Sequence, residues 1–81
     1  MESLEKLTEF IVKNLVVDPD SVSVKGLEEE DSITIEVLVS SDDMGKVIGK
    51  RGMIASAIRT VVQASSRLNN LPYVKVNIDS F

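Results

Sequence analysis

Apolar residues recur at helical spacing near the start of the chain. The polar residues between them, such as Glu5, Glu9 and Lys13, fall on the opposite face. The apolar stripe consists of Leu4, Leu7, Ile11, Val12, Leu15 and Val16. This pattern predicts an amphipathic helix that ends at Asp18-Pro19-Asp20, because proline disfavours helical geometry in the residue before it.

Two segments in which apolar and polar residues alternate follow this helix. Residues 21–25 carry valine at every second position, and residues 33–39 carry isoleucine or valine in the same way. The acidic stretch from Glu28 to Asp31 separates them and is typical of a solvated turn. We therefore expect two strands joined as a hairpin.

The second half of the chain predicts two helices and a last strand. Ser40-Ser41-Asp42-Asp43 is typical of a helix start, with hydroxyl caps before carboxylates that favour the positive end of the helix dipole, and this short helix should reach about Ile48. After a glycine-bounded loop, an apolar stripe over residues 54–68 predicts the longest helix, which Asn69 to Pro72 should end. Residues 73–79 alternate as a strand.

The order helix, strand, strand, helix, helix, strand predicts a two-layer α+β fold. Two helices connect the second strand to the last one, which favours parallel pairing between these strands. We expect a three-stranded mixed sheet with helices packed on one face. A chain of 81 residues has room for one hydrophobic core, so residues 1–81 should form a single domain.

Composition narrows the function further. The sequence contains no histidine and no cysteine, which argues against an enzyme, a metal site and a disulfide framework. No apolar run approaches the length of a membrane span, and the first residues lack the pattern of a secretory signal. We therefore expect a cytoplasmic protein that has no cofactor, no small-molecule substrate and no membrane contact.

The charges are distributed unevenly. The net charge is −4, yet residues 1–43 hold twelve acidic and three basic residues, whereas residues 44–81 hold six basic residues and Asp79 as the only acidic one. A phosphate responds to the field within roughly 8–10 Å in physiological salt, so a local basic region can bind nucleic acid on an acidic protein. Chance segregation on a solvated surface is the alternative.

The most informative segment is Gly49-Lys50-Arg51-Gly52, between the two later helices. Glycine has no Cβ, so both glycines allow a sharp turn and let a sugar-phosphate chain approach the backbone closely. Lys50 and Arg51 add positive charge that neutralises phosphates without needing a particular base. A GxxG turn between two helices, placed after a hairpin, is the arrangement of the KH loop that clamps about four nucleotides.

The segment from Asp43 to Ala64, with its VIGKRG core and the IRTVV run from Ile58 to Val62, resembles small bacterial KH proteins of the KhpA family. This resemblance implies a type II KH fold and a cytoplasmic protein that binds single-stranded RNA, with an RNA chaperone or post-transcriptional role. It also implies homodimers, or heteromers with a second KH protein of the KhpB (Jag-like) type, and a link to cell-shape and cell-wall regulation.

The resemblance also assigns roles to individual positions. Gly49, Lys50, Arg51 and Gly52 correspond to the backbone clamp, and the groove for bases is carried over onto Gly45, Lys46, Ile48 and Ile54. Ile48 and Ile54 fit equally well as core residues. Lys46 and Arg59 can supply further phosphate contacts or be solvated surface residues.

Two observations keep a second function open, a protein-interaction or dimerisation platform with weak RNA binding. A basic residue is common in the family where Met53 and Ser56 stand here, so the positive surface is weaker than the family pattern implies. Phe10, Tyr73 and Phe81 are the only aromatic residues, too few for an RNA-stacking sheet. We expect Tyr73 and Phe81 to be core residues, or else interface residues.

Overall fold

The computed structural model describes residues 2–81. Its helices are α1 (Glu2–Lys13), α2 (Met44–Ile48) and α3 (Met53–Leu68), and its strands are β1 (Ser23–Glu28), β2 (Ser32–Val39) and β3 (Tyr73–Ser80). Short 3-10 turns cover Pro19–Ser21, Ser41–Asp43 and Lys50–Gly52. The predicted element order is confirmed.

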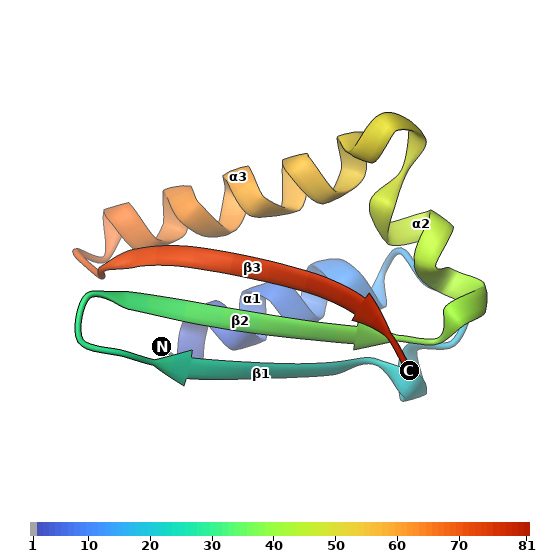
Figure 1. Ribbon diagram of the computed structural model, residues 1–81, viewed down its shortest axis with the longest axis horizontal. Helices are drawn as coiled ribbons and strands as arrows, with labels where there is room; N and C mark the ends of the chain where they lie inside the picture. Colours follow the sequence, from blue (N-terminus) through green and yellow to red (C-terminus); the bar gives the residue numbers. More distant parts are fainter. Residues whose placement is uncertain (1) are drawn as a thin grey trace.

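The three strands form one mixed sheet in the order β1-β2-β3 (Figure 1). β1 and β2 pair antiparallel as a hairpin, whereas β2 and β3 pair parallel, with Ile35 opposite Val76. The parallel pair brings β3 back along β2 after the α2–α3 connection, as the connection length predicts. The α+β fold and the mixed sheet expected from the sequence are confirmed.

One face of the sheet forms the core. Every second residue of β2 is buried, and β3 adds Val74 and Val76 to the same face. α1 packs against β1 and α3 packs against β3, so the helices cover this face side by side. The buried apolar residues are Leu4, Val12, Ile33, Ile35, Val37, Val39, Val47, Ala55, Ile58, Val62, Val74 and Val76.

The first helix ends earlier than the apolar pattern predicts. α1 stops at Lys13, and Leu15 and Val16 belong to the following loop, although both still pack against the core. At this end the Asn14 backbone amide donates to both the Phe10 carbonyl at 3.3 Å and the Ile11 carbonyl at 3.2 Å, so the last turn tightens, and the Asn14 side chain adds a second bond to the Phe10 carbonyl at 2.7 Å. Apolar periodicity continued past the true end because loop residues can also reach the core.

The expectation that Tyr73 and Phe81 belong to the core is wrong. Their exposed fractions are 65% and 70%. Tyr73 opens β3 and points to the open face of the sheet together with Lys75, while Val74 between them faces the core. Phe81 lies beyond the last strand residue, and its backbone amide donates a hydrogen bond to the Val39 carbonyl at 3.1 Å.

Candidate nucleic-acid interface

The connection between α2 and α3 is a tight turn made by two glycines in backbone conformations that other residues avoid. Gly49 has φ 75° and ψ 175°, and Gly52 has φ 74° and ψ 15°. The Gly52 amide donates to the Gly49 carbonyl at 3.2 Å, which closes the turn. The sharp reversal predicted for these two positions is therefore present, and its φ values suit glycine.

Gly49 also lies against a side chain of the next helix. A Cβ built on Gly49 would sit 2.6 Å from Cγ1 of Ile54, closer than van der Waals contact permits. A Cβ on Gly52 would meet nothing within 4 Å. Gly49 is thus required by its φ and by close packing, whereas Gly52 is required by its φ alone.

The two residues between the glycines present their charges outward. Lys50 and Arg51 are both exposed, and neither makes a side-chain hydrogen bond or ion pair within residues 2–81. Arg51 has φ 57° and ψ 25°, a left-handed conformation that costs a non-glycine residue about 1–2 kcal/mol. The turn therefore keeps a long cation in a strained backbone position with its charge unpaired.

The other predicted site residues on α2 have different surroundings. Gly45 is exposed, and a Cβ there would meet no neighbouring atom within 4 Å. Lys46 is about half exposed and lies 3.9 Å from a carboxylate oxygen of Asp43. Ile48 is half-buried and packs against the core, as does Ile54. Core packing of these two isoleucines is thus observed, and their contact with bases stays a prediction.

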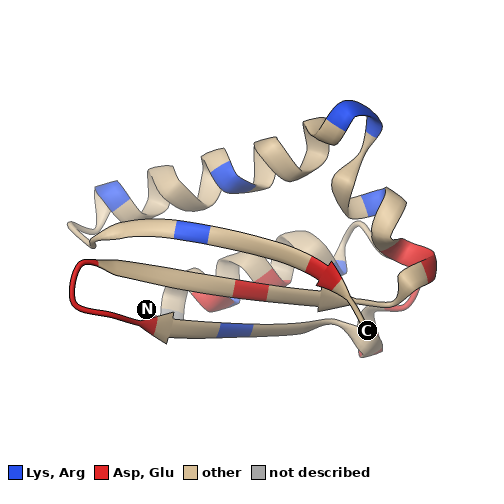
Figure 2. Cartoon of the chain, in the orientation of Figure 1, with Lys and Arg blue, Asp and Glu red and all other residues tan. Residues whose placement is uncertain are grey.

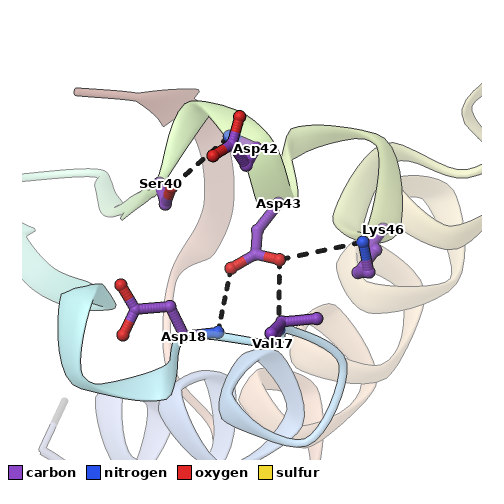
Figure 3. A network of polar contacts seen from close by, with 6 residues as sticks. All are labelled: Val17, Asp18, Ser40, Asp42, Asp43 and Lys46. Carbon is purple, nitrogen blue, oxygen red and sulfur yellow. Dashed lines mark hydrogen bonds and ion pairs between the residues drawn. The ribbon is translucent and has the colours of Figure 1, made fainter.

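Asp43, which the sequence assigned only to the helix start, anchors α2 to the rest of the protein (Figure 3). The residue is buried, with 2% exposed, and its side chain accepts hydrogen bonds from the backbone amides of Val17 and Asp18, both at 3.1 Å. The Val17 amide lowers the pKa of Asp43 most; burial opposes this, and the Asp18 amide and Lys46 lower the pKa further.

This anchor joins two segments that are 25 and 26 residues apart in the chain. It fixes the loop after α1 against the start of α2, and α2 in turn leads directly into the glycine turn (Figures 1 and 3). Nothing in the local sequence distinguishes Asp43 from Asp42, which is exposed. The partners are backbone amides, so the residue types at positions 17 and 18 could not be used to predict the contact with Asp43.

Arg59 extends the candidate site along α3. Its Nε donates to the Val76 carbonyl of β3 at 3.1 Å. One turn later, Gln63 donates to the Val74 carbonyl at 3.2 Å. Both side chains therefore lie over the outer edge of β3. Gln63 was not selected from the sequence, although its i+4 spacing from Arg59 on the polar side of the helix was a usable signal.

Six of the nine basic residues lie on α2, the glycine turn, α3 and β3, whereas Lys6 and Lys13 lie on α1 and Lys25 lies on β1 (Figure 2). Acidic residues dominate the hairpin turn and the segment just before α2. The uneven charge along the sequence thus corresponds to an uneven charge in space. The face that carries the glycine turn is the positive one, which suits a polyanion.

A second surface feature lies between α1 and α3. This apolar groove has a volume of about 540 Å³, and Phe10 and Met53 at its rim are 69% and 68% exposed. Its lining residues are Leu7, Phe10, Ile11, Leu15, Met53, Ile54, Ala57, Ile58 and Val61. Ile54 therefore contacts both the glycine turn and this groove.

Residues 2–81 contain neither a metal-binding cluster nor a membrane-spanning helix. No group of three or more acidic, histidine or cysteine side chains lies close enough to hold a metal ion. No helix in this range is both long and apolar enough to cross a membrane.

An αββααβ fold with a GxxG turn between its second and third helices defines the type II KH domain. The sequence model described as KhpA/KhpB, KH domain, matches residues 5–78. The chain belongs to the KhpA/KhpB family of KH domains.

Curated relatives agree with this assignment. The chain is 51% identical over 67 residues to the RNA-binding protein KhpA of Clostridium perfringens, which covers 83% of this chain and 89% of the relative. It is 48% identical over 65 residues to the RNA-binding protein KhpA of Borreliella burgdorferi, covering 80% and 79%.

Solved structures share the fold at low sequence identity. A crystal structure of Aquifex aeolicus Era bound to GDP and aluminium fluoride superposes with a TM-score of 0.73 at 18% identity, and the match covers 96% of this chain and 30% of the Era chain. Era in complex with a nucleotide analogue and a segment of 16S ribosomal RNA gives a TM-score of 0.70 at 16% identity, over the same shares of the two chains.

Proposed function

We propose that this chain is a non-catalytic KH module that binds short single-stranded RNA through the turn from Gly49 to Gly52 and the adjacent groove. The observation that carries the proposal is the turn itself: two positive-φ glycines around two exposed cations without side-chain partners. Such a turn lets a sugar-phosphate backbone approach the protein chain while Lys50 and Arg51 neutralise phosphates. The names of the curated relatives, RNA-binding protein KhpA, support the same ligand.

The roles of the remaining site residues follow from their positions. Gly45 and Lys46 on α2 would face the bound RNA strand beside the turn. Ile48 and Ile54 would support the base-binding groove beside the turn from the core side. Arg59, held over the edge of β3 by its Nε, keeps its terminal nitrogens for a phosphate or a base. Residues 1–81 act as one KH domain in this proposal.

The absence of histidine and cysteine from the sequence supports binding rather than catalysis. A cytoplasmic RNA chaperone or post-transcriptional regulator fits this chemistry, because phosphate contacts give affinity with little base specificity. Cooperation with a KhpB (Jag-like) KH protein and a role in cell-shape regulation are the finer parts of the proposal, and they rest on family membership.

Titration of fluorescent single-stranded RNA tests the proposal. We expect Lys50→Asp with Arg51→Asp to reduce affinity at least tenfold and to lower the salt dependence, since each lost phosphate contact removes about 0.7 from the slope of log affinity against log salt. The matched control is Lys13→Asp with Lys25→Asp, the same charge reversal at exposed positions outside the turn. Equal affinity of a folded loop variant and wild type would refute the proposal.

The apolar groove favours a second function alongside RNA binding, namely self-association. The same surface has both a hollow and exposed side chains, Phe10 and Met53. A two-fold interface between identical chains uses one surface on both chains, so the exposed side chains of each copy can fill the hollow of the other. None of its lining residues is charged, so a second copy meets no unpaired charge there. A dimer also gives two RNA sites and hence a higher effective affinity for longer RNA.

Light scattering of two variants tests self-association. We expect a dimeric wild type, a monomeric Phe10→Glu variant, and an unchanged dimer for Leu68→Glu, which places the same charge on an exposed residue outside the groove. A wild type that stays monomeric but binds a KhpB-type protein through Phe10 would replace the second copy with that partner. A Phe10→Glu variant as dimeric as wild type would exclude the groove.

A further inference from the structure

Three polar side chains of α3 form a row that continues from the glycine turn to the opposite end of the helix. Arg59, Gln63 and Arg67 are spaced four residues apart, so they lie on one face of α3. The first two donate to the carbonyls of Val76 and Val74, which shows that this face looks onto the outer edge of β3. The row therefore follows the seam between α3 and β3.

A small hollow of about 60 Å³ ends this seam (Figure 1 shows the α3–β3 connection at the far end from the turn). Its lining residues are Gln63, Ser66, Arg67, Leu71, Pro72, Tyr73 and Val74. Ser66 donates to the Pro72 carbonyl at 2.9 Å, which fixes the connection against the helix. The walls of the hollow are therefore held in place by the fold.

Two of these residues have the chemistry that single-stranded RNA uses. Tyr73 is 65% exposed and lines the hollow at the start of the edge strand β3, with its ring on the side of Lys75, away from the core, so the ring offers a free face at the strand edge. The Arg67 side chain is exposed, and it makes no hydrogen bond or ion pair within the described part of the chain. An aromatic face stacks a base, and a neighbouring arginine binds the adjacent phosphate.

The distance between the two ends of the seam exceeds what one KH clamp covers. From Met53 to Arg67 the helix rises about 21 Å at 1.5 Å per residue. A GxxG loop holds about four nucleotides. A strand that leaves the clamp along the seam would meet Arg59 and Gln63 first and the Tyr73 hollow last.

We infer that Tyr73 and Arg67 form a second RNA subsite, at which a base stacks on the tyrosine ring and a phosphate pairs with the arginine. This inference rests on the proposed function, because the RNA must first be held at the glycine turn. It makes the bound segment longer than the four nucleotides of the clamp, and it assigns a function to an exposed aromatic residue that the core does not use.

The charge around the hollow also determines how far along the seam a bound RNA strand extends. Ser32, the ladder partner of Tyr73, directly follows the acidic turn from Glu28 to Asp31. Figure 2 shows this acidic turn at the same end of the molecule as the α3–β3 connection. Carboxylates repel phosphates, so a strand is not drawn past Tyr73 toward the hairpin. The second subsite is thus the last contact along the seam.

Oligonucleotides of different length test the second subsite. Wild type and a variant with Tyr73→Ala and Arg67→Gln are titrated with single-stranded RNA of four, eight and twelve nucleotides. We expect unchanged affinity for the four-nucleotide RNA and at least about fivefold weaker binding of the twelve-nucleotide RNA, the size of one lost base stack. Lys25→Gln, an exposed cation on β1, is the control for loss of one charge.

Tyrosine fluorescence gives a direct second measurement. Tyr73 is the only tyrosine in a chain without tryptophan, so its emission reports on its own surroundings. We expect quenching by the twelve-nucleotide RNA and none by the four-nucleotide RNA. Quenching that disappears in the Lys50→Asp and Arg51→Asp variant would show that the subsite depends on the clamp.

The outcomes separate this inference from the proposed function. The second subsite alone would be overturned if wild type binds the four-nucleotide RNA through the turn but the variant with Tyr73→Ala and Arg67→Gln (the far-end variant) loses affinity equally at every RNA length. Unchanged affinity of this variant at every length would overturn it as well. A wild type that binds RNA of no length would overturn both. Circular dichroism of the far-end variant is expected to match wild type, because both substituted side chains are exposed.

Discussion

Gly49 packs directly against Ile54, with room for no Cβ between them: the added atom would lie 2.6 Å from Cγ1 of the isoleucine. Gly49 also adopts φ 75° and ψ 175°, a region open almost only to glycine. The turn that carries the candidate RNA clamp is thus held by packing with the first turn of α3. The position of the cations depends on this contact.

We therefore expect Gly49→Ala to lower the free energy of unfolding by about 2–4 kcal/mol, from backbone strain plus overpacking. Gly52→Ala should cost only about 1–2 kcal/mol, because its φ is positive but the space around it is open. Urea denaturation of both variants measures the difference. Adding Ile54→Ala should rescue part of the Gly49→Ala loss in a double-mutant cycle; strict additivity would contradict the contact.

Substitution of Arg51 is expected to affect the stability of the fold and the affinity for RNA in different directions. It holds a left-handed conformation, so Arg51→Gly relieves about 1–2 kcal/mol of strain, while glycine adds about 0.4–1 kcal/mol of unfolded-state entropy cost. We expect unfolding free energy to stay equal or to rise by up to about 1 kcal/mol, while RNA affinity falls.

The matched variant is Lys50→Gly, which removes the same charge at a position without positive φ. It should weaken RNA binding to a similar degree but also lower stability by about 0.5–1 kcal/mol. Thermal unfolding and RNA titration of the two variants check both halves of the comparison. Equal destabilisation by the two glycines would show that Arg51 is not strained.

The parts of the fold that periodicity determines were predictable from the sequence. The apolar stripe on α3 repeats about every turn of the helix, and the alternation on β2 repeats every two residues, so both patterns can be read from nearby sequence positions. The structure confirms both. The alternation of β3 already placed Tyr73 on the side of Lys75, so expecting it in the core gave too much weight to residue type. The glycine turn was found because its residue types are themselves unusual.

The sequence could not reveal features that depend on distant backbone groups. Asp43 binds amides of Val17 and Asp18, and Gln63 binds the carbonyl of Val74; the partner atoms are present in every residue and leave no trace in residue type. The groove between α1 and α3 has a similar origin, because apolar stripes predict burial without showing which part of each stripe stays uncovered.

A gain of function should follow from restoring charge near the clamp. Ser56 is exposed in the first turns of α3, close in sequence to Gly52. We expect Ser56→Lys to raise RNA affinity several-fold and to steepen the salt slope by about 0.7, one additional phosphate contact. Ala64→Lys, an equally exposed position two turns further along α3, should change the slope less. Fluorescence anisotropy at three salt concentrations measures both slopes.

Asp43 makes stability depend on pH in a defined direction. Its pKa is lowered in the folded protein, chiefly by the Val17 amide, so its contribution to stability is fully present above the ordinary aspartate pKa of about 3.9 and is lost as pH falls through the lower folded value. Asp43→Asn keeps the size of the side chain but has one acceptor oxygen for two amides.

We accordingly expect Asp43→Asn to lower the melting temperature at pH 7. The gap to wild type should narrow as the pH falls from about 4 toward the lower folded pKa of Asp43, because the unfolded wild-type chain binds a proton at Asp43 before the folded protein does. Asp42→Asn is the control, because Asp42 is exposed and its side chain holds no distant segment. A gap that stays constant down to pH 2 would mean that the carboxylate charge adds nothing to the anchor. If the anchor positions α2, the RNA affinity of the still-folded Asp43→Asn variant at pH 7 should fall as well, since α2 leads directly into the glycine turn.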